Sequence, residues 1–178
     1  MDEAKFWRII DRVRRSEDDP YEAMQAALSR LSADEIVAFA ALYDARIDEA
    51  DLIDLWGAAY LINGGCSDDG FHYFRVWLVS QGRKVYQAAL ANPDSLAAVV
   101  DPDEEECESD IDSAVARAWE EKTGKSTEAF HKAWVRVRVP PPAREQGEDW
   151  DFDDDEEARR RLPRLAAMYL GGDAPDGK

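Results

Sequence analysis

Cysteine and histidine are scarce in this chain of 178 residues, with two of each. Cys66 and Cys107 are too few for a disulfide framework, and neither lies in a Cys-x-x-Cys pair. The two histidines, His72 and His131, stand in no recognised metal-ligand spacing. We therefore expect no metal and no cofactor.

Long apolar runs and a targeting segment are also missing. The first residues, 1–6, show no basic region followed by an apolar stretch, so no signal peptide is evident. The longest strongly apolar stretch, residues 52–62, is interrupted by Asp54 and is too short to span a bilayer. These absences predict a cytoplasmic protein without a membrane partner.

Basic residues are few relative to acidic ones: 22 against 39, for a formal net charge of −17. Residues 101–112 hold eight acids and residues 145–157 hold nine, with no Lys or Arg in either run. Outside these two acidic runs the chain carries 22 acids and 22 bases, so its body is balanced. Such runs are usually solvated surfaces, but they also suit a basic protein partner or a cation. Repulsion disfavours direct binding to a nucleic acid backbone.

Hydrophobic residues make up 45% of the chain, which is enough for a core, and they recur mostly at helical spacing. The pattern predicts a mainly α fold, a compact bundle of about seven or eight helices with an extended, acidic C-terminal arm. We expect one domain over residues 1–170 and a disordered tail over 171–178. The expected helices cover residues 2–15, 20–31, 33–47, 49–62, 69–91, 93–100, 111–123 and 156–170.

Helix ends are marked by residues with a physical reason to stand there. Ser32-Ala33-Asp34-Glu35 is a capping-box signal, and Pro163 is expected to kink or split the last helix. Asn63-Gly64-Gly65 predicts a left-handed C-terminal cap, and Ser67 or Asp68 predicts the cap of the next helix.

The segment from Trp134 to Val139 differs, because valine and arginine alternate with period two. We interpret it as an extended segment on the helical body, ended by prolines at 140–142. Residues 140–155 then form a proline- and acid-rich arm. Its aromatic residues, Trp150 and Phe152, are expected to fold back as a lid over the core or to form a hook for a partner.

A conspicuous run begins at Trp56 and reads Trp-x-Ala-Ala-Tyr-x-Ile-Asn-Gly-Gly-Cys-Ser-Asp-Asp-x-Phe-x-Tyr-Phe-Arg-x-Trp-Leu. It resembles the core signature of the bacterial domain of unknown function 4240. Shorter pieces extend the resemblance over nearly the whole chain: Phe6-Trp7, Asn92 to Ala97, Gly147 to Asp151, and Pro163 to Leu165. Residues 125–145 match nothing. The resemblance implies a small bacterial protein and assigns it no catalytic residues.

The centre of this run is the candidate binding site. It comprises Asn63, Gly64, Gly65, Cys66, Ser67, Asp68, Asp69, His72 and Arg75. The two glycines permit left-handed backbone and close approach, and the following helix start offers free N–H groups. Because Asp68 and Asp69 already supply negative charge, phosphate is a poor guest, and a cation or a guanidinium fits better.

Several interpretations of this corner stay open. It could be a purely structural helix–helix connection in which Arg75 pairs with Asp68, Asp69 or an acid on the fourth helix. It could be a ligand or partner site. Cys66 and His72 could form a thiolate pair oriented by one of the acids, which would make the protein an enzyme.

Three functions follow from these alternatives. The first is a non-enzymatic protein-binding or regulatory module, for example an inhibitor or immunity-type protein acting on a basic partner. The second is an enzyme or small-ligand sensor with its site at residues 63–75. The third is an acidic protein that mimics DNA. The first predicts a corner whose groups are satisfied internally, and the second predicts side chains converging on a pocket.

Overall fold

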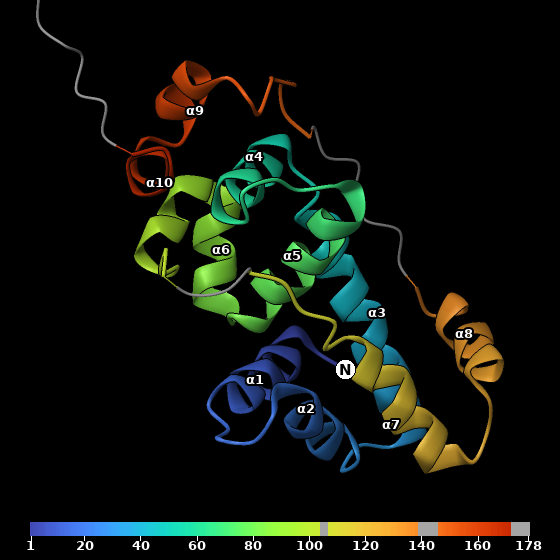
Figure 1. Cartoon of the computed structure of the whole chain (residues 1–178). Helices are drawn as coiled ribbons and strands as arrows, with labels where there is room; N and C mark the ends of the chain where they lie inside the picture. The colour runs from blue at the N-terminus through green and yellow to red at the C-terminus, as the bar shows by residue number, and fades with distance from the viewer. Residues whose placement is uncertain (104–106, 139–145, 172–178) are drawn as a thin grey trace, which may run out of the picture.

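The computed structural model describes residues 1–103, 107–138 and 146–171, and this part of the chain is mainly helical (Figure 1). It contains eleven helices and no strand. They are α1 (Glu3–Arg14), α2 (Pro20–Leu28), α3 (Ala33–Glu49), α4 (Ile53–Ile62), α5 (Asp68–Ser80), α6 (Arg83–Ala91), the 3-10 helix η1 (Pro93–Ala98), α7 (Ser113–Thr123), α8 (Thr127–Val135), α9 (Asp155–Arg161) and α10 (Pro163–Tyr169).

The helical class is therefore confirmed, but the expected count of seven or eight is too low. One reason is Gly82, which divides the expected helix 69–91 into α5 and α6. Its φ of 86° lies in a region that glycine alone adopts easily, and an added Cβ would approach the Asp11 carboxylate to 2.7 Å. The apolar pattern runs through this position, so only the glycine marks the break.

A second reason is residues 134–138, where the prediction of an extended segment is wrong. Trp134 and Val135 end α8, and residues 136–137 form a turn in which the Arg138 N–H donates to the Trp134 carbonyl. The period-two pattern misled because Val135 and Val137 are exposed, so the alternation does not mark a buried face. Val139 lies outside the described residues, as do residues 104–106, 140–145 and 172–178.

The expected ends of several helices are confirmed. Ser32 and Glu35 form both halves of the capping box at α3, and Gly124 ends α7 with a left-handed conformation. Pro163 splits the last helix into α9 and α10.

The core lies between α1, α3, α4, α5 and α7. The apolar residues that recur at helical spacing on α1 and α3 are buried in it: Phe6, Ile9, Ile10, Val13, Ile36, Phe39, Ala40, Tyr43 and Ile47. In Figure 1, α9 and α10 lie beside α4 at the end of the molecule away from α1 and α2, and α8 lies at the edge beside α3 and α7. Helix α8 has no buried residue, so its packing is the weakest of the longer helices.

The C-terminal segment, residues 146–171, packs against α4, although α7 and α8 lie between the two in the sequence. Its Trp150 ring packs against Gly57, and Phe152 contacts the rings of Trp56 and Tyr60. The expectation that these aromatic residues fold back on the helical body is thus confirmed.

Candidate functional site

The corner between α4 and α5 is built from backbone contacts. The Gly65 N–H donates to the Tyr60 carbonyl at 2.8 Å, and Gly64 has a φ of 65°, as a left-handed C-terminal cap requires. Ser67 is the N-cap of α5, and its hydroxyl accepts from the Gly70 N–H at 3.1 Å. The predicted end of one helix and start of the next are both confirmed.

Long-range hydrogen bonds fix this corner further. The Trp56 indole N–H donates to the Cys66 carbonyl at 2.9 Å, and the Trp56 ring stacks on Phe71. The Asn63 side-chain oxygen accepts from the Cys107 N–H at 3.0 Å, which ties the corner to the first acidic run. Within the described residues the Asn63 side-chain nitrogen is buried and has no hydrogen-bond partner.

Arg75 pairs with an acid that sequence reasoning did not single out. Its guanidinium lies 3.5 Å from Asp51, donates to the Ile47 carbonyl, and sits 4.6 Å from the Phe71 ring centre. Asp51 belongs to the segment expected as the fourth helix, but α4 begins two residues later. Burial lowers the pKa of Arg75, and the Asp51 carboxylate opposes that shift.

Asp68 and Asp69 are exposed in the first turn of α5. There they complement the partial positive charge of the helix start, as acids in a first turn do. The contacts of Arg75 run to Asp51, Ile47 and Phe71, so the expected pairing of Arg75 with Asp68 or Asp69 is not formed.

The described polar contacts of Cys66 and His72 are with other residues, Ser67 and Asp112. Burial and the nearby Glu108 carboxylate raise the pKa of the Cys66 thiol to about 11, so the thiol is protonated at neutral pH. The His72 ring faces Asp112, with 3.9 Å between Nε2 and the carboxylate. Among the described residues no group of three or more His, Cys, Asp and Glu side chains could hold a metal ion.

Comparison with known proteins supports the resemblance carried by this corner. The family model described as a protein of unknown function (DUF4240) matches residues 1–121, about two thirds of the chain. The chain belongs to the DUF4240 family. Neither a search of curated proteins nor a search of solved structures found a match. The matched residues include the whole corner, while the resembling pieces at residues 147–151 and 163–165 lie beyond them.

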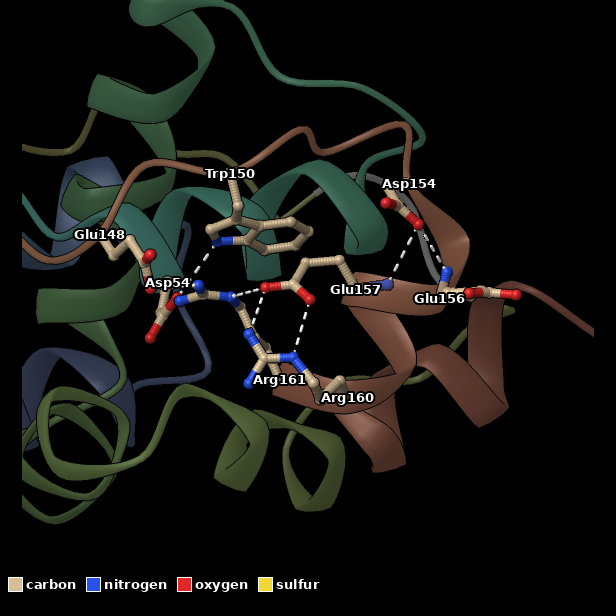
Figure 2. A network of polar contacts seen from close by, with 8 residues as sticks. All are labelled: Asp54, Glu148, Trp150, Asp154, Glu156, Glu157, Arg160 and Arg161. Carbon is tan, nitrogen blue, oxygen red and sulfur yellow. Dashed lines mark hydrogen bonds and ion pairs between the residues drawn. The ribbon is translucent and has the colours of Figure 1, made fainter.

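The DUF4240 chain has a second polar cluster, which joins its C-terminal segment to α4 (Figure 2). The Arg161 guanidinium, 13% exposed, bonds to Asp54 at 3.1 Å, to Glu148 at 3.0 Å and to Glu157 at 2.6 Å. Trp150 donates its indole N–H to the same Asp54 carboxylate at 3.1 Å. Hydrogen bonds from Arg160 and Arg161 lower the pKa of Glu157 to about 2.

This Arg161 cluster neutralises part of the second acidic run internally. Sequence reasoning missed it because Asp54 and Arg161 are separated by 107 positions. The sequence did contain one signal of this cluster: Asp54 is the single acid within the apolar stretch 52–62.

This DUF4240 protein also has two cavities among its helices. One, of about 440 Å³, opens between α1, α2 and α5, with Trp77 and Met24 on its walls. The other, of about 240 Å³, lies between α3, α7 and α8 and contains two carboxylates, Asp44 and Asp112. The structure describes no helix long and apolar enough to cross a membrane.

Proposed function

We propose that this DUF4240 protein is a non-enzymatic binding module that recognises a basic protein partner, as an inhibitor or immunity-type protein would. The observation that carries the proposal is the difference between the polar residues of the corner and the acids of the two runs. At the corner, Asn63, Ser67 and Arg75 are used in a cap and internal hydrogen bonds, and Asp68 and Asp69 lie exposed in the first turn of α5. Among the residues that the structure describes, most acids of the two runs are exposed.

The corner supports this proposal in detail. Ser67 caps α5, Asn63 holds the Cys107 backbone, and Arg75 is held by Asp51 and Ile47. A protonated Cys66 thiol has little nucleophilic character. A catalytic centre would instead bring these side chains toward one reacting point.

The acidic runs supply the complementary surface. The exposed acids of the first run include Asp101, Asp103, Glu108 and Asp110, and those of the second include Asp149, Asp151 and Glu156. Concentrated charge of one sign speeds encounter with an oppositely charged partner and makes association depend on salt. The partner is therefore expected to present a basic face.

The test is retention of host proteins on the immobilised full-length chain at increasing salt, followed by binding measurements with each purified basic protein retained. The double variant Asp149→Asn/Glu156→Gln removes two exposed charges of the second run. Its matched control, Glu17→Gln/Glu22→Gln, removes two exposed acids outside both runs, one of them also in the first turn of a helix.

We expect the Asp149/Glu156 variant to weaken the complex roughly fivefold at low salt and the control to leave it unchanged. If both variants weakened the complex equally, binding would depend on the net charge of the protein and not on the acidic runs. A complex that is insensitive to salt and to both variants would overturn the proposal.

A further inference from the structure

The cavity between α3, α7 and α8 is an uncommon combination of charge and aromatic surface. It has a volume of about 240 Å³. Its walls include Tyr43, Asp44, Asp112, Phe130, His131 and Trp134. Tyr43 is buried and donates its hydroxyl to the Val76 carbonyl, so it forms a fixed floor.

The cavity contains two carboxylates whose charged forms are disfavoured by burial. Burial raises the pKa of Asp44 to about 6. A hydrogen bond with the Trp134 side chain and the charge of Arg138 oppose this shift, and the carboxylates of Asp48 and Asp112 add to it. Burial also raises the pKa of Asp112. Arg138 opposes the shift at Asp44 and is paired with Asp48 at 3.2 Å, and the His72 ring lies 3.9 Å from Asp112. A cation entering the cavity would therefore be attracted by both carboxylates.

The aromatic wall selects the kind of cation. Trp134 and His131 lie with their ring centres 5.2 Å apart, and Phe130 packs on Trp119 at 5.7 Å. The chain's own Arg138 guanidinium lies 5.1 Å from the Trp134 ring centre, so this ring already contacts a planar cation. Guanidinium groups combine stacking on aromatic faces with bonding to carboxylates better than ammonium groups do.

We propose that this cavity receives an arginine side chain of the basic partner, with its guanidinium between Asp44 and Asp112 and against Trp134. The inference rests on the proposed function and names the contact at its centre. Asp112 is the last residue of the first acidic run, so one carboxylate of the cavity belongs to that run. Such an anchor is typical of interfaces in which one buried arginine contributes much of the affinity.

Arginine binding also has a consequence for α8. This helix has no buried residue and contributes Phe130, His131 and Trp134 to the cavity. A guanidinium that contacts both α3 and α8 holds α8 on the body. Amide exchange over residues 127–135 should therefore slow when the cavity is filled.

The experiment titrates the full-length protein with the blocked peptide acetyl-Gly-Arg-Gly-amide, followed by NMR and by amide exchange. The matched probes are the same peptide with lysine, the same peptide with the neutral isostere citrulline, and free arginine. The variants are Asp44→Asn, which keeps the shape and removes the charge, and Glu17→Gln, which removes a charge far from the cavity.

We expect the arginine peptide to bind in the millimolar range and to slow exchange in α8. The lysine peptide should bind several-fold more weakly, and the citrulline peptide should not bind. Asp44→Asn should weaken arginine binding at least tenfold, and Glu17→Gln should not change it. Affinity should fall as the pH is lowered through about 6, because Asp44 becomes protonated beside Asp48, Asp112, His131 and Arg138.

Equal binding of the arginine and citrulline peptides, or full affinity in Asp44→Asn, would overturn the inference. Free arginine binding as tightly as the peptide would overturn the assignment to a protein partner. Failure of the proposed function looks different: the peptide would still bind, but no basic protein would be retained in the salt-dependent assay. If a basic partner is retained and Asp44→Asn does not weaken its binding, the proposed function is supported and the arginine site in this cavity is overturned.

Discussion

Gly57 shows at the scale of one residue how the C-terminal segment is fitted to α4. A Cβ atom built there would lie 2.2 Å from Cζ2 of Trp150, and its nearest neighbours all belong to that ring. Alanine is otherwise the better helix residue by about 1 kcal/mol, so steric exclusion is a sufficient reason for glycine within α4.

Gly57→Ala should therefore destabilise the protein by about 1–3 kcal/mol, because the indole must move out of its place. In a Trp150→Ala background the same change should stabilise by up to about 1 kcal/mol, because the obstacle is gone. Urea unfolding of the four proteins measures both values. The same sign in the two backgrounds would contradict the contact.

Asp44 makes a prediction about pH. Burial raises its pKa from the ordinary 3.8 to about 6, so the folded protein holds this proton more tightly than the unfolded chain does. The stabilisation from the proton is complete below pH about 4 and is lost as the pH rises through 6. Asp44→Asn should then be more stable than the natural chain by ~1 kcal/mol at pH 7, after allowance for partial solvent screening, and equal to it at pH 4. Thermal unfolding between pH 4 and 8 tests this, and a difference independent of pH would contradict it.

At the scale of the element, Asp94 connects two helices. Leu162 gives α10 no side-chain cap, and the buried Asp94 carboxylate of η1 accepts from the Arg164 and Leu165 N–H groups at 2.9 and 3.0 Å. The sequence predicts Asn92-Pro93-Asp94 as a helix start, which is confirmed for η1. It does not indicate that Asp94 caps a second helix some 70 residues away.

Asp94→Ala should cost about 2–3 kcal/mol, because one buried and one partly buried N–H group lose a charged acceptor. Asp154→Ala is the matched control, since Asp154 also accepts from two N–H groups, at the exposed start of α9. Its loss should cost about 1 kcal/mol, because water replaces the cap. Similar costs for the two variants, measured by urea unfolding, would argue against the role of Asp94 between helices.

These elements also show what the sequence can and cannot predict. Local signals worked where the physics is local: the Ser32 capping box, the Asn63 to Ser67 corner and the split at Pro163 are all confirmed. Local sequence signals do not predict a contact when the partner lies far away in the sequence. For Arg75 the expectation of an acid from the fourth helix, 49–62, included Asp51 without naming it. The cavity of Asp44 and Trp134 was not predicted, because its parts are brought together only by the packing of α8 on α3.

At the scale of the whole molecule, the family match ends at residue 121, but the hydrophobic core does not. The C-terminal segment contributes Ala158, Leu162, Leu165 and Ala166, all at most 1% exposed. Helix α10 packs on both α4 and η1, which lie inside the matched region. Residues 146–171 therefore complete a core that the matched part leaves open on one side.

A chain ending at residue 145 should for this reason lose its cooperative unfolding transition. Burying two leucines, two aromatic rings and two alanines contributes more than about 5 kcal/mol, which is comparable to the whole stability of a typical domain. Addition of a peptide of residues 146–171 should restore the transition, because the segment is held only by non-covalent contacts. Near-ultraviolet circular dichroism during thermal unfolding follows both steps. If the shortened chain unfolded as cooperatively and at the same temperature as the full chain, the core of α4 would have to be complete without α9 and α10.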